Sequence, residues 1–327
     1  MITEVSLLVR LITLLDKIPP PPPPGKRPRG KPRQDSEALI LKALLVMIVR
    51  CLYTAHALLA FLAQDDPTVR AVRAQLTEHG NFPTRRTWER RLAVLPPRLP
   101  TMIGWFGRHL VTVLWPWQQH GRAVAVDSTM LRTAGGVWHK KAREQGVIPH
   151  SSIDLEAGWS KSGYHGWWYG WKLPLAIAVG SVWLPLAAAL TVANVGDNLL
   201  APKLLDELPA EVRSVLGDTH YNDPAVRQAC HAHGLELVAT RRGTRPHRDG
   251  GVEVRRIFHK LRSQSIEPFN GLFKDFFGWQ KNLPVKGLVK SQLFALGAIL
   301  LYQLILFYQY EEGAEVGKGL KALLKAA

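Results

Sequence analysis

Acidic residues and cysteines are both scarce in this chain. Its 327 residues include 26 Asp and Glu against 42 Lys and Arg, which gives a formal net charge of +16. A globular protein this basic usually binds a polyanion, either nucleic acid or an anionic membrane surface. The two cysteines, Cys51 and Cys230, lie far apart and outside any metal-ligand spacing. The sequence therefore argues against a disulfide framework and a zinc module, and it favours a reducing compartment.

The chain also lacks an apolar run of membrane-spanning length and an export signal. Its most apolar stretch covers only 293–308, whereas a transmembrane helix needs about 20 residues. We expect a buried core helix there; the alternative is a protein anchored in a membrane through this segment. The start, MITEVSLLVRLITLLD, has Glu4 where a signal peptide is basic and Arg10 inside the apolar run. It predicts an amphipathic helix within 1–18.

Proline and glycine divide the rest of the N-terminal part. Six consecutive prolines open a linker at 19–35, because such a run adopts an extended polyproline II rod. The basic stretch GKRPRGKPR behind them is either a solvated linker or an arm that follows DNA phosphates or enters the minor groove. We assign 36–118 to a helical DNA-binding region, in which 36–62 has one mostly apolar helical pattern. A peripheral tail is expected at 311–327.

Residues 70–95 have the pattern of a helix-turn-helix module. A helix, TVRAVRAQL, is followed by a turn containing Gly80 and Pro83, and Thr84 is a suitable N-cap for the short helix after it. The polar side of this second helix carries Arg85, Arg86, Arg90 and Arg91. These arginines are predicted to bind DNA; a surface helix with solvated arginines is the alternative.

Beyond His120 the pattern changes to an α/β order. Apolar segments of β type and helical segments alternate as β-β-β-α-β-α-β-α. The predicted strands are 122–131, 167–179, 182–193, 211–218 and 235–241. This order predicts an α/β domain at 119–310 built on five strands. A Gly- and Ser-rich segment, 133–165, is interpreted as an insertion in the first hairpin.

Three carboxylates are expected to meet at one edge of this sheet. Asp127 and Asp218 each end a short apolar strand, and the carboxyl ends of strands form the ligand-binding edge of an open sheet. Turn capping is the alternative for either of them alone. Glu267 is predicted in the first turn of a helix with Ser265 as its N-cap. Three such carboxylates repel each other unless hard divalent cations bind between them, and two Mg²⁺ ions sharing an Asp would support phosphoryl transfer.

The segment that leads to Glu267 is strongly basic and is predicted to bind phosphates. Its basic residues include Arg241, Arg242, Arg255, Arg256, Lys260 and Arg262. Binding of DNA by such a stretch would depend strongly on salt. Asp154 and Glu156 are interpreted as solvated loop acids and Asp197 as a helix N-cap. Tryptophans of the segment 167–171 are expected to pack the first hairpin, with base stacking as the alternative.

These motifs resemble those of the DDE transposases of bacterial insertion sequences. The matching stretches are VAVDST, YGWKLPLAIAV, LTVANVGDNLLAPKLL, VLGDTHYND and SIEPFNGLFK. The resemblance implies an RNase H-like catalytic domain, a five-stranded mixed sheet with helices, in which Asp127, Asp218 and Glu267 form the metal-binding triad. It also implies DNA contacts at Lys274, near the scissile phosphate, and at Lys172.

One part of the family pattern differs in this chain. The family often places Tyr and Arg seven and four positions before the Glu. Those positions hold Lys260 and Ser263 here, and Arg262 lies one position away.

The function that the resemblance implies is DNA transposition. The protein would bind the terminal inverted repeats of its insertion sequence, cleave the strands with Mg²⁺ or Mn²⁺, two ions in all, and transfer them to target DNA. Pairing of two element ends implies a homodimer on double-stranded DNA, with no membrane partner, in the bacterial cytoplasm and associated with the nucleoid. The alternatives are an RNase H-like structure-selective nuclease and a catalytically inactive DNA-binding protein derived from a transposase.

Overall fold

The computed structural model describes residues 6–19, 21, 35–117, 121–162, 166–239 and 252–327, and for 162 and 252–259 it describes the backbone alone. Several predictions concern other parts of the chain. The basic arm behind the proline run lies outside the described residues, as do Arg241 and Arg242. The side chains of Arg255 and Arg256 lie outside them too.

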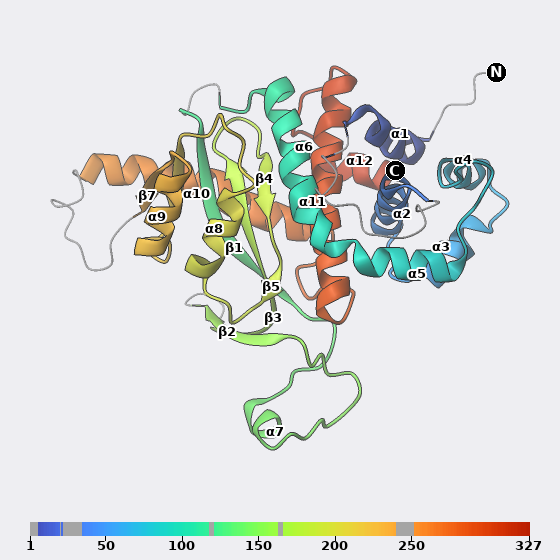
Figure 1. Ribbon diagram of the computed structural model, residues 1–327, viewed down its shortest axis with the longest axis horizontal. Coiled ribbons are helices and arrows are strands. Elements are labelled where there is room, and N and C mark those ends of the chain that lie inside the picture. Colours follow the sequence, from blue (N-terminus) through green and yellow to red (C-terminus); the bar gives the residue numbers. More distant parts are fainter. Residues whose placement is uncertain (1–5, 20, 22–34, 118–120, 163–165, 240–251) are drawn as a thin grey trace.

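The N-terminal region is helical, as predicted. Its helices are α1 (Leu7–Leu14), α2 (Glu37–Val49), α3 (Ala55–Leu62), α4 (Pro67–Gln75), α5 (Arg85–Val94) and α6 (Leu99–Leu114), with the 3-10 turns η1 (Leu15–Lys17) and η2 (Pro96–Arg98). Helix α1 is amphipathic and buries Leu8, Leu11 and Ile12 against α2 and α4. In Figure 1 helices α1 to α5, blue to cyan, gather on one side of the molecule.

The single helical pattern expected over 36–62 is interrupted between α2 and α3. Cys51 has φ of 54°, a left-handed conformation through which a right-handed helix does not continue. Thr54 then starts α3, because its Oγ1 accepts a hydrogen bond from the Ala57 N–H at 3.0 Å. The break was not predicted because the segment is mostly apolar on both sides of it.

The predicted helix-turn-helix is only partly present. Thr84 caps α5 as expected, since its Oγ1 accepts from the Thr87 N–H at 3.3 Å. However, α4 and α5 are joined by residues 76–84, which contain a backbone bridge between Glu78 and Asn81. A helix-turn-helix connection has about three to four residues. Helix α3 packs against both α4 and α5, so these three helices form the unit.

The C-terminal part contains one mixed sheet. Its strands are β1 (Ala123–Arg132), β2 (Gly158–Ser162), β3 (Gly166–Ala178), β4 (Pro185–Ala188), β5 (Thr191–Val192), β6 (Ser214–Gly217) and β7 (Glu236–Ala239). Their order is β2-β3-β1-β6-β7, and β4 and β5 also pair with β3. Strand β1 is antiparallel to β3 and parallel to β6, which is parallel to β7.

Strands β2, β5 and β4 share one edge of β3. They pair with residues 166–170, 171–172 and 175–177 of β3 in turn, so the sheet is five strands wide. Three antiparallel positions followed by two parallel ones form the RNase H-like arrangement, and the predicted fold class is confirmed. The segment 133–165, predicted as an insertion, contains the short helix α7 (Lys140–Glu144) and supplies β2 to the sheet.

Helices cover both faces of this sheet. Helix α8 (Asp197–Leu205) packs on β1, β3 and β4, and α9 (Pro224–Ala232) packs beside it on β7. Helix α10 (Val252–Phe276) contacts β1, β3 and β6. In Figure 1 α8 and α9 lie in front of the strands and α10 passes behind them. Neighbouring residues of β1 therefore point to different helices, because side chains alternate along a strand.

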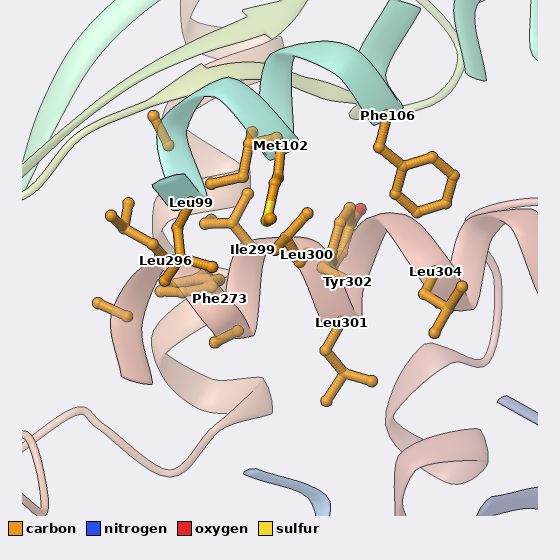
Figure 2. Packing of buried hydrophobic residues seen from close by; sticks show 14 of the residues in the cluster. Leu99, Met102, Phe106, Phe273, Leu296, Ile299, Leu300, Leu301, Tyr302 and Leu304 are labelled. Atoms are coloured by element: carbon orange, nitrogen blue, oxygen red, sulfur yellow. The ribbon is translucent and has the colours of Figure 1, made fainter. Parts of the chain in front are cut away.

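Helix α11 (Leu288–Glu311) joins the two parts of the molecule. It contacts α1, α2, α5 and α6 as well as β4 and β5. Figure 2 shows Leu99, Met102 and Phe106 of α6 packed against Leu296, Ile299 and Leu300 of α11. Helix α11 is long and apolar enough to cross a membrane, and 94% of its most apolar window is buried, as expected for a core helix. The last helix, α12 (Leu320–Ala326), follows it.

A buried amide ties α11 to both neighbours. Gln303 is fully buried, and its Nε2 donates to the Ile103 carbonyl of α6 at 3.0 Å and to the Pro185 carbonyl of β4 at 2.8 Å. The predicted boundary near 118 is thus no break in packing, because one hydrophobic cluster runs through helices α1 to α6, the sheet and α11.

Replacing Gln303 by Met should lower the free energy of unfolding by about 1–3 kcal/mol, since the side-chain volume is kept but two buried carbonyls lose a donor. Chemical denaturation would measure this loss. Gln292→Met is the matched control, because Gln292 is only half-buried and donates to one carbonyl, that of Leu190. Equal losses in the two variants would contradict a linking role for Gln303.

Candidate active site

Asp127 and Asp218 lie side by side where β6 ends. Strand β1 pairs in parallel with β6 from Ala123↔Ser214 to Ala125↔Leu216. Two further steps in the same register place Asp127 beside Asp218, which directly follows β6. Asp127 was expected to end its strand, but β1 continues to Arg132 along β3. The carboxylate therefore stands on a rigid interior strand at the point where the parallel partner stops.

The Asp127 carboxylate is held in a partly buried position. Its side chain is 24% exposed, and its Oδ1 accepts from the Ser128 N–H at 2.8 Å. Burial raises the pKa of Asp127 to about 6, while the guanidinium of Arg262 acts in the opposite direction. The nearby Asp218 and Asp197 carboxylates raise the pKa further. The raised pKa of Asp127 therefore comes mainly from the loss of solvation at this position, with a smaller part from the neighbouring carboxylates.

The Asp218 carboxylate is more open and is oriented by its own loop. Its Oδ1 accepts from the His220 N–H at 2.8 Å, and its Oδ2 lies 3.1 Å from the His220 Nδ1. These contacts turn the carboxylate over the end of β6. The turn at this point also requires Gly217, because a Cβ there would lie 2.6 Å from the Cβ of Tyr221.

Glu267 lies in the middle of α10, and the prediction that it starts a helix at Ser265 is wrong. Helix α10 begins at Val252, and the Ser265 Oγ donates back to the Leu261 carbonyl at 2.8 Å. Pro268 was interpreted as a first-turn residue, but it lies inside the helix. Proline has no N–H, so the carbonyl of residue 264 loses its helical donor. The Trp183 indole N–H replaces it, donating to the Gln264 carbonyl at 3.2 Å.

The predicted apolar face of this helix is present. Ile266, Phe269 and Phe273 are fully buried, and α10 packs on β1 and β3. Glu267 stays 54% exposed on the adjoining side. Burial of this face fixes the rotation of α10, and that rotation aims residue 267 at the edge of the sheet.

Arg262 connects the carboxylates. Its Nη2 lies 3.5 Å from Asp127 Oδ2, and its Nη1 lies 3.1 Å from Glu267 Oε1. The guanidinium therefore lies between two carboxylates that were predicted to bind metal. The Arg262 side chain is only 13% exposed and that of Asp127 24%, so their contact is largely buried, whereas the contact with Glu267 is open to solvent.

The donor set suits a hard divalent cation, but the carboxylates are not gathered around one point. Asp127, Asp218 and Glu267 offer only oxygen atoms, which Mg²⁺ and Mn²⁺ prefer. Within the described part of the chain, no three acidic, His or Cys side chains are close enough to hold an ion as they stand. Arg262 explains the separation of Asp127 from Glu267, because its guanidinium fills the space between them.

Asp197, set aside as an N-cap, belongs to the site. The cap position of α8 is Gly196, and Asp197 is the first helical residue. Its Oδ1 accepts from the Ser128 Oγ at 2.5 Å, and its Oδ2 lies 3.4 Å from the Lys172 Nζ. Ser128 points toward α8 while Asp127 points toward α10. Asp197 and Lys172 thus anchor the residue whose N–H holds Asp127.

Lys172 and Tyr221 are internal residues of this region. The Lys172 amine is buried and donates to the Val195 carbonyl at 2.8 Å; its predicted contact with DNA receives no support from this position. The Tyr221 hydroxyl is buried, and no group among the described residues is positioned to form a good hydrogen bond with it. Burial and the neighbouring Asp197 and Asp127 raise its pKa well above the usual value, so it stays a neutral phenol. Nothing in the sequence around Asp218 indicated that Tyr221 would be buried or would stay a neutral phenol.

The other predicted DNA-binding residues differ in exposure. The Lys274 amine lies over the Trp168 ring at 5.9 Å, and burial lowers the pKa of this amine. The Arg132 guanidinium also lies over this ring, at 4.2 Å. Lys260 is exposed on α10. On α5 the residues Arg85, Arg86 and Arg90 are exposed. Arg91 is buried, and its Nη2 lies 3.4 Å from the Ser36 carbonyl, so it joins α5 to the start of α2.

The prediction that Asp154 and Glu156 are solvated loop acids is wrong for Asp154. This residue is 2% exposed and accepts from the Thr133 Oγ1 at 2.5 Å and from the Gly287 N–H at 2.9 Å. Glu156 remains exposed, yet its Oε2 accepts from the Leu288 N–H at 2.6 Å. The two acids cap the N-terminus of α11 from the insertion.

Tryptophans of the first hairpin pack mainly as expected. Trp168 and Trp171 are buried, as is Tyr169. Trp167 is the exception, with 65% of its surface exposed, and it meets the Trp159 ring edge to face.

Comparisons with known proteins identify one family. The family model for the transposase DDE domain matches residues 118–304. Among curated proteins no match was found. Solved structures with some likeness include the Mos1 mariner paired end complex with Mn (12% identity, TM-score 0.22, 86% of this chain and 80% of that chain). Another is the Mos1 transposase paired-end complex with left transposon end, which has 14% identity and a TM-score of 0.22. The match covers 88% of this chain and 80% of that chain. Such low TM-scores add nothing to what the strand order shows.

The raised pKa of Asp127 predicts a pH-dependent cost of folding. The unfolded pKa is 3.8 and the folded pKa about 6, so the protein is stabilised below pH 4 and loses this contribution as the pH rises through 6. Asp127→Asn should therefore raise the free energy of unfolding at pH 8 by about 1–3 kcal/mol and change it little at pH 4. Denaturation at both pH values in EDTA would measure it.

Asp206→Asn is the control, since it removes an exposed carboxylate on a surface helix end. The same effect of Asp127→Asn at pH 4 and pH 8 would show that its pKa is not raised by folding.

Proposed function

Because the chain belongs to the transposase DDE domain family, we propose that it binds the terminal inverted repeats of an insertion sequence and catalyses cleavage and transfer of DNA strands with divalent metal ions. The match covers 118–304, which includes the whole mixed sheet and helices α8, α9 and α10 that pack on it. The N-terminal helices would then recognise DNA.

One observation carries the proposed chemistry. Asp127, Asp218 and Glu267 come from three separate segments of the chain; Asp127 and Asp218 occupy neighbouring strand positions, and Arg262 contacts both Asp127 and Glu267. A divalent cation would compensate the like charges of such a set of carboxylates. A strongly basic chain with an acidic centre suits a polyanionic substrate that reacts at a metal site.

The three carboxylates would hold the metal, which when bound lowers the pKa of water or a 3′-hydroxyl and stabilises the leaving oxygen. Asp127 is the central ligand in this assignment, because it stands on a rigid strand next to Asp218. Its Oδ1 accepts from the Ser128 N–H, so Oδ2, which faces Arg262 in this structure, would be the oxygen that binds the cation. Ser128 is itself held by Asp197, so the orientation of Asp127 depends on the α8 side of the sheet.

The DNA would lie across the exposed basic residues on both parts of the molecule. On α5 these are Arg85, Arg86 and Arg90, and on α10 Lys260 is exposed while Lys274 is half-buried. Since α11 fixes the N-terminal helices against the sheet, the spacing between the two contact regions would be set by the fold. Joining two element ends requires two such sites, and we therefore propose a homodimer on DNA in the bacterial cytoplasm.

The central test uses a plasmid that carries the gene with its native flanking DNA. Wild-type protein with Mg²⁺ should nick the DNA at the outer boundaries of flanking inverted repeats, whereas Asp218→Ala should reduce nicking by at least about a thousandfold, because a metal ligand is lost. Binding to the same DNA should stay within about threefold of wild type, as measured by gel shift. Asp223→Ala, which removes the N-cap of α9, controls for the loss of a nearby aspartate. Undiminished nicking by Asp218→Ala would refute the assignment.

Contacts between α5 and DNA predict a change in salt dependence. Replacing Arg85, Arg86 and Arg90 by Gln should reduce the slope of log K against log salt by about 0.9 for each phosphate contact that is lost. Fluorescence anisotropy across a salt series would give both slopes. The control replaces Arg122, Arg213 and Arg227, which are exposed elsewhere, and removes the same charge. Identical slopes in both triple variants would mean that α5 does not contact phosphates.

A further inference from the structure

The guanidinium of Arg262 lies where a metal ion would have to bind. It contacts Asp127 Oδ2 at 3.5 Å and Glu267 Oε1 at 3.1 Å. A Mg²⁺ ion shared by these two carboxylates would need oxygens at about 2.0–2.1 Å. The guanidinium is too large to remain between two carboxylates at that spacing. The two cations therefore exclude each other on steric grounds.

Electrostatics gives the same result. A divalent ion within a few ångströms of a guanidinium is repelled strongly in a partly buried site. Arginine stays charged at all accessible pH values, so it cannot relieve this repulsion by losing a proton. The side chain has to move away before a metal ion binds between Asp127 and Glu267.

The present position of Arg262 leaves part of its hydrogen-bonding capacity unused. Its Nε is buried without a hydrogen-bond partner among the described residues. A phosphate would be a better partner, because the guanidinium fork binds phosphate oxygens in pairs.

We propose that Arg262 couples metal loading to DNA binding. In the DNA-free protein its guanidinium forms ion pairs with Asp127 and Glu267. When DNA binds, the guanidinium pairs with a backbone phosphate instead, and the two carboxylates become free to bind the metal. The inference rests on the proposed function in taking these residues as metal ligands. Linkage then requires that DNA and metal tighten each other's binding by the same factor.

The test measures binding of Mn²⁺ to the full chain without DNA, by electron paramagnetic resonance of the free ion. Arg262→Gln should bind Mn²⁺ at least about tenfold more tightly than wild type, because a competing cation is gone. Arg262→Lys, which keeps the charge without the fork, should fall between them. The control is Arg132→Gln, whose guanidinium lies over Trp168 on the same sheet and should leave the affinity within about twofold.

A second measurement needs no variant. A short DNA duplex should tighten Mn²⁺ binding by wild type at least about fivefold, after subtraction of Mn²⁺ bound to DNA alone, and should have little effect on Arg262→Gln. Unchanged Mn²⁺ affinity in Arg262→Gln, or no effect of DNA on wild type, would overturn the coupling. Failure of the proposed function looks different: Mn²⁺ would then bind Asp218→Ala and Glu267→Gln as well as wild type, or would bind none of the proteins, Arg262→Gln included, even with DNA present.

Discussion

Mutual repulsion of carboxylates at the edge of the sheet is the constraint on which the site depends. Asp127 and Asp218 are fixed side by side by the parallel register of β1 and β6, and the buried face of α10 brings Glu267 toward them. The fold cannot relax this repulsion by moving the groups apart, since each is attached to a buried element. Arg262 provides one positive charge beside Asp127 and Glu267, and it offsets only part of the rise that burial causes in the pKa of Asp127.

Several contacts outside the three carboxylates stabilise the elements that carry Asp127, Asp218 and Glu267. Pro268 would weaken α10 one residue from Glu267, and the Trp183 indole restores the missing hydrogen bond. On the opposite face, Asp197 holds Ser128 and thereby the orientation of Asp127. Helix α11 adds a larger constraint, because it packs on both the N-terminal helices and the sheet. The helices proposed to recognise DNA and the sheet that carries the candidate site thus share a single hydrophobic core.

The sequence predicted the order of the strands, the neighbouring positions of Asp127 and Asp218 and the apolar face of the Glu267 helix, because these are written in local patterns of apolar residues. The role of the three carboxylates as metal ligands stays a prediction. It failed where a distant residue decides the outcome. Pro268 looked like a helix start, and only Trp183, far away in the chain, allows α10 to extend back to Val252. Asp154 looked solvated, although the start of α11 buries it. Asp197 gave no sign that Ser128 would reach it.

The position of Arg262 follows from the geometry of its helix. The family pattern has an arginine four residues before the Glu, a spacing that places both side chains on one helix face. This chain has Ser263 there, and the Ser263 hydroxyl bonds to the Lys260 carbonyl. A shift of one residue turns a side chain by about 100° around the axis, and Arg262 accordingly faces the sheet with 13% exposure. From there it reaches Asp127 as well as Glu267, so the displaced arginine acquires a contact that the usual spacing does not favour.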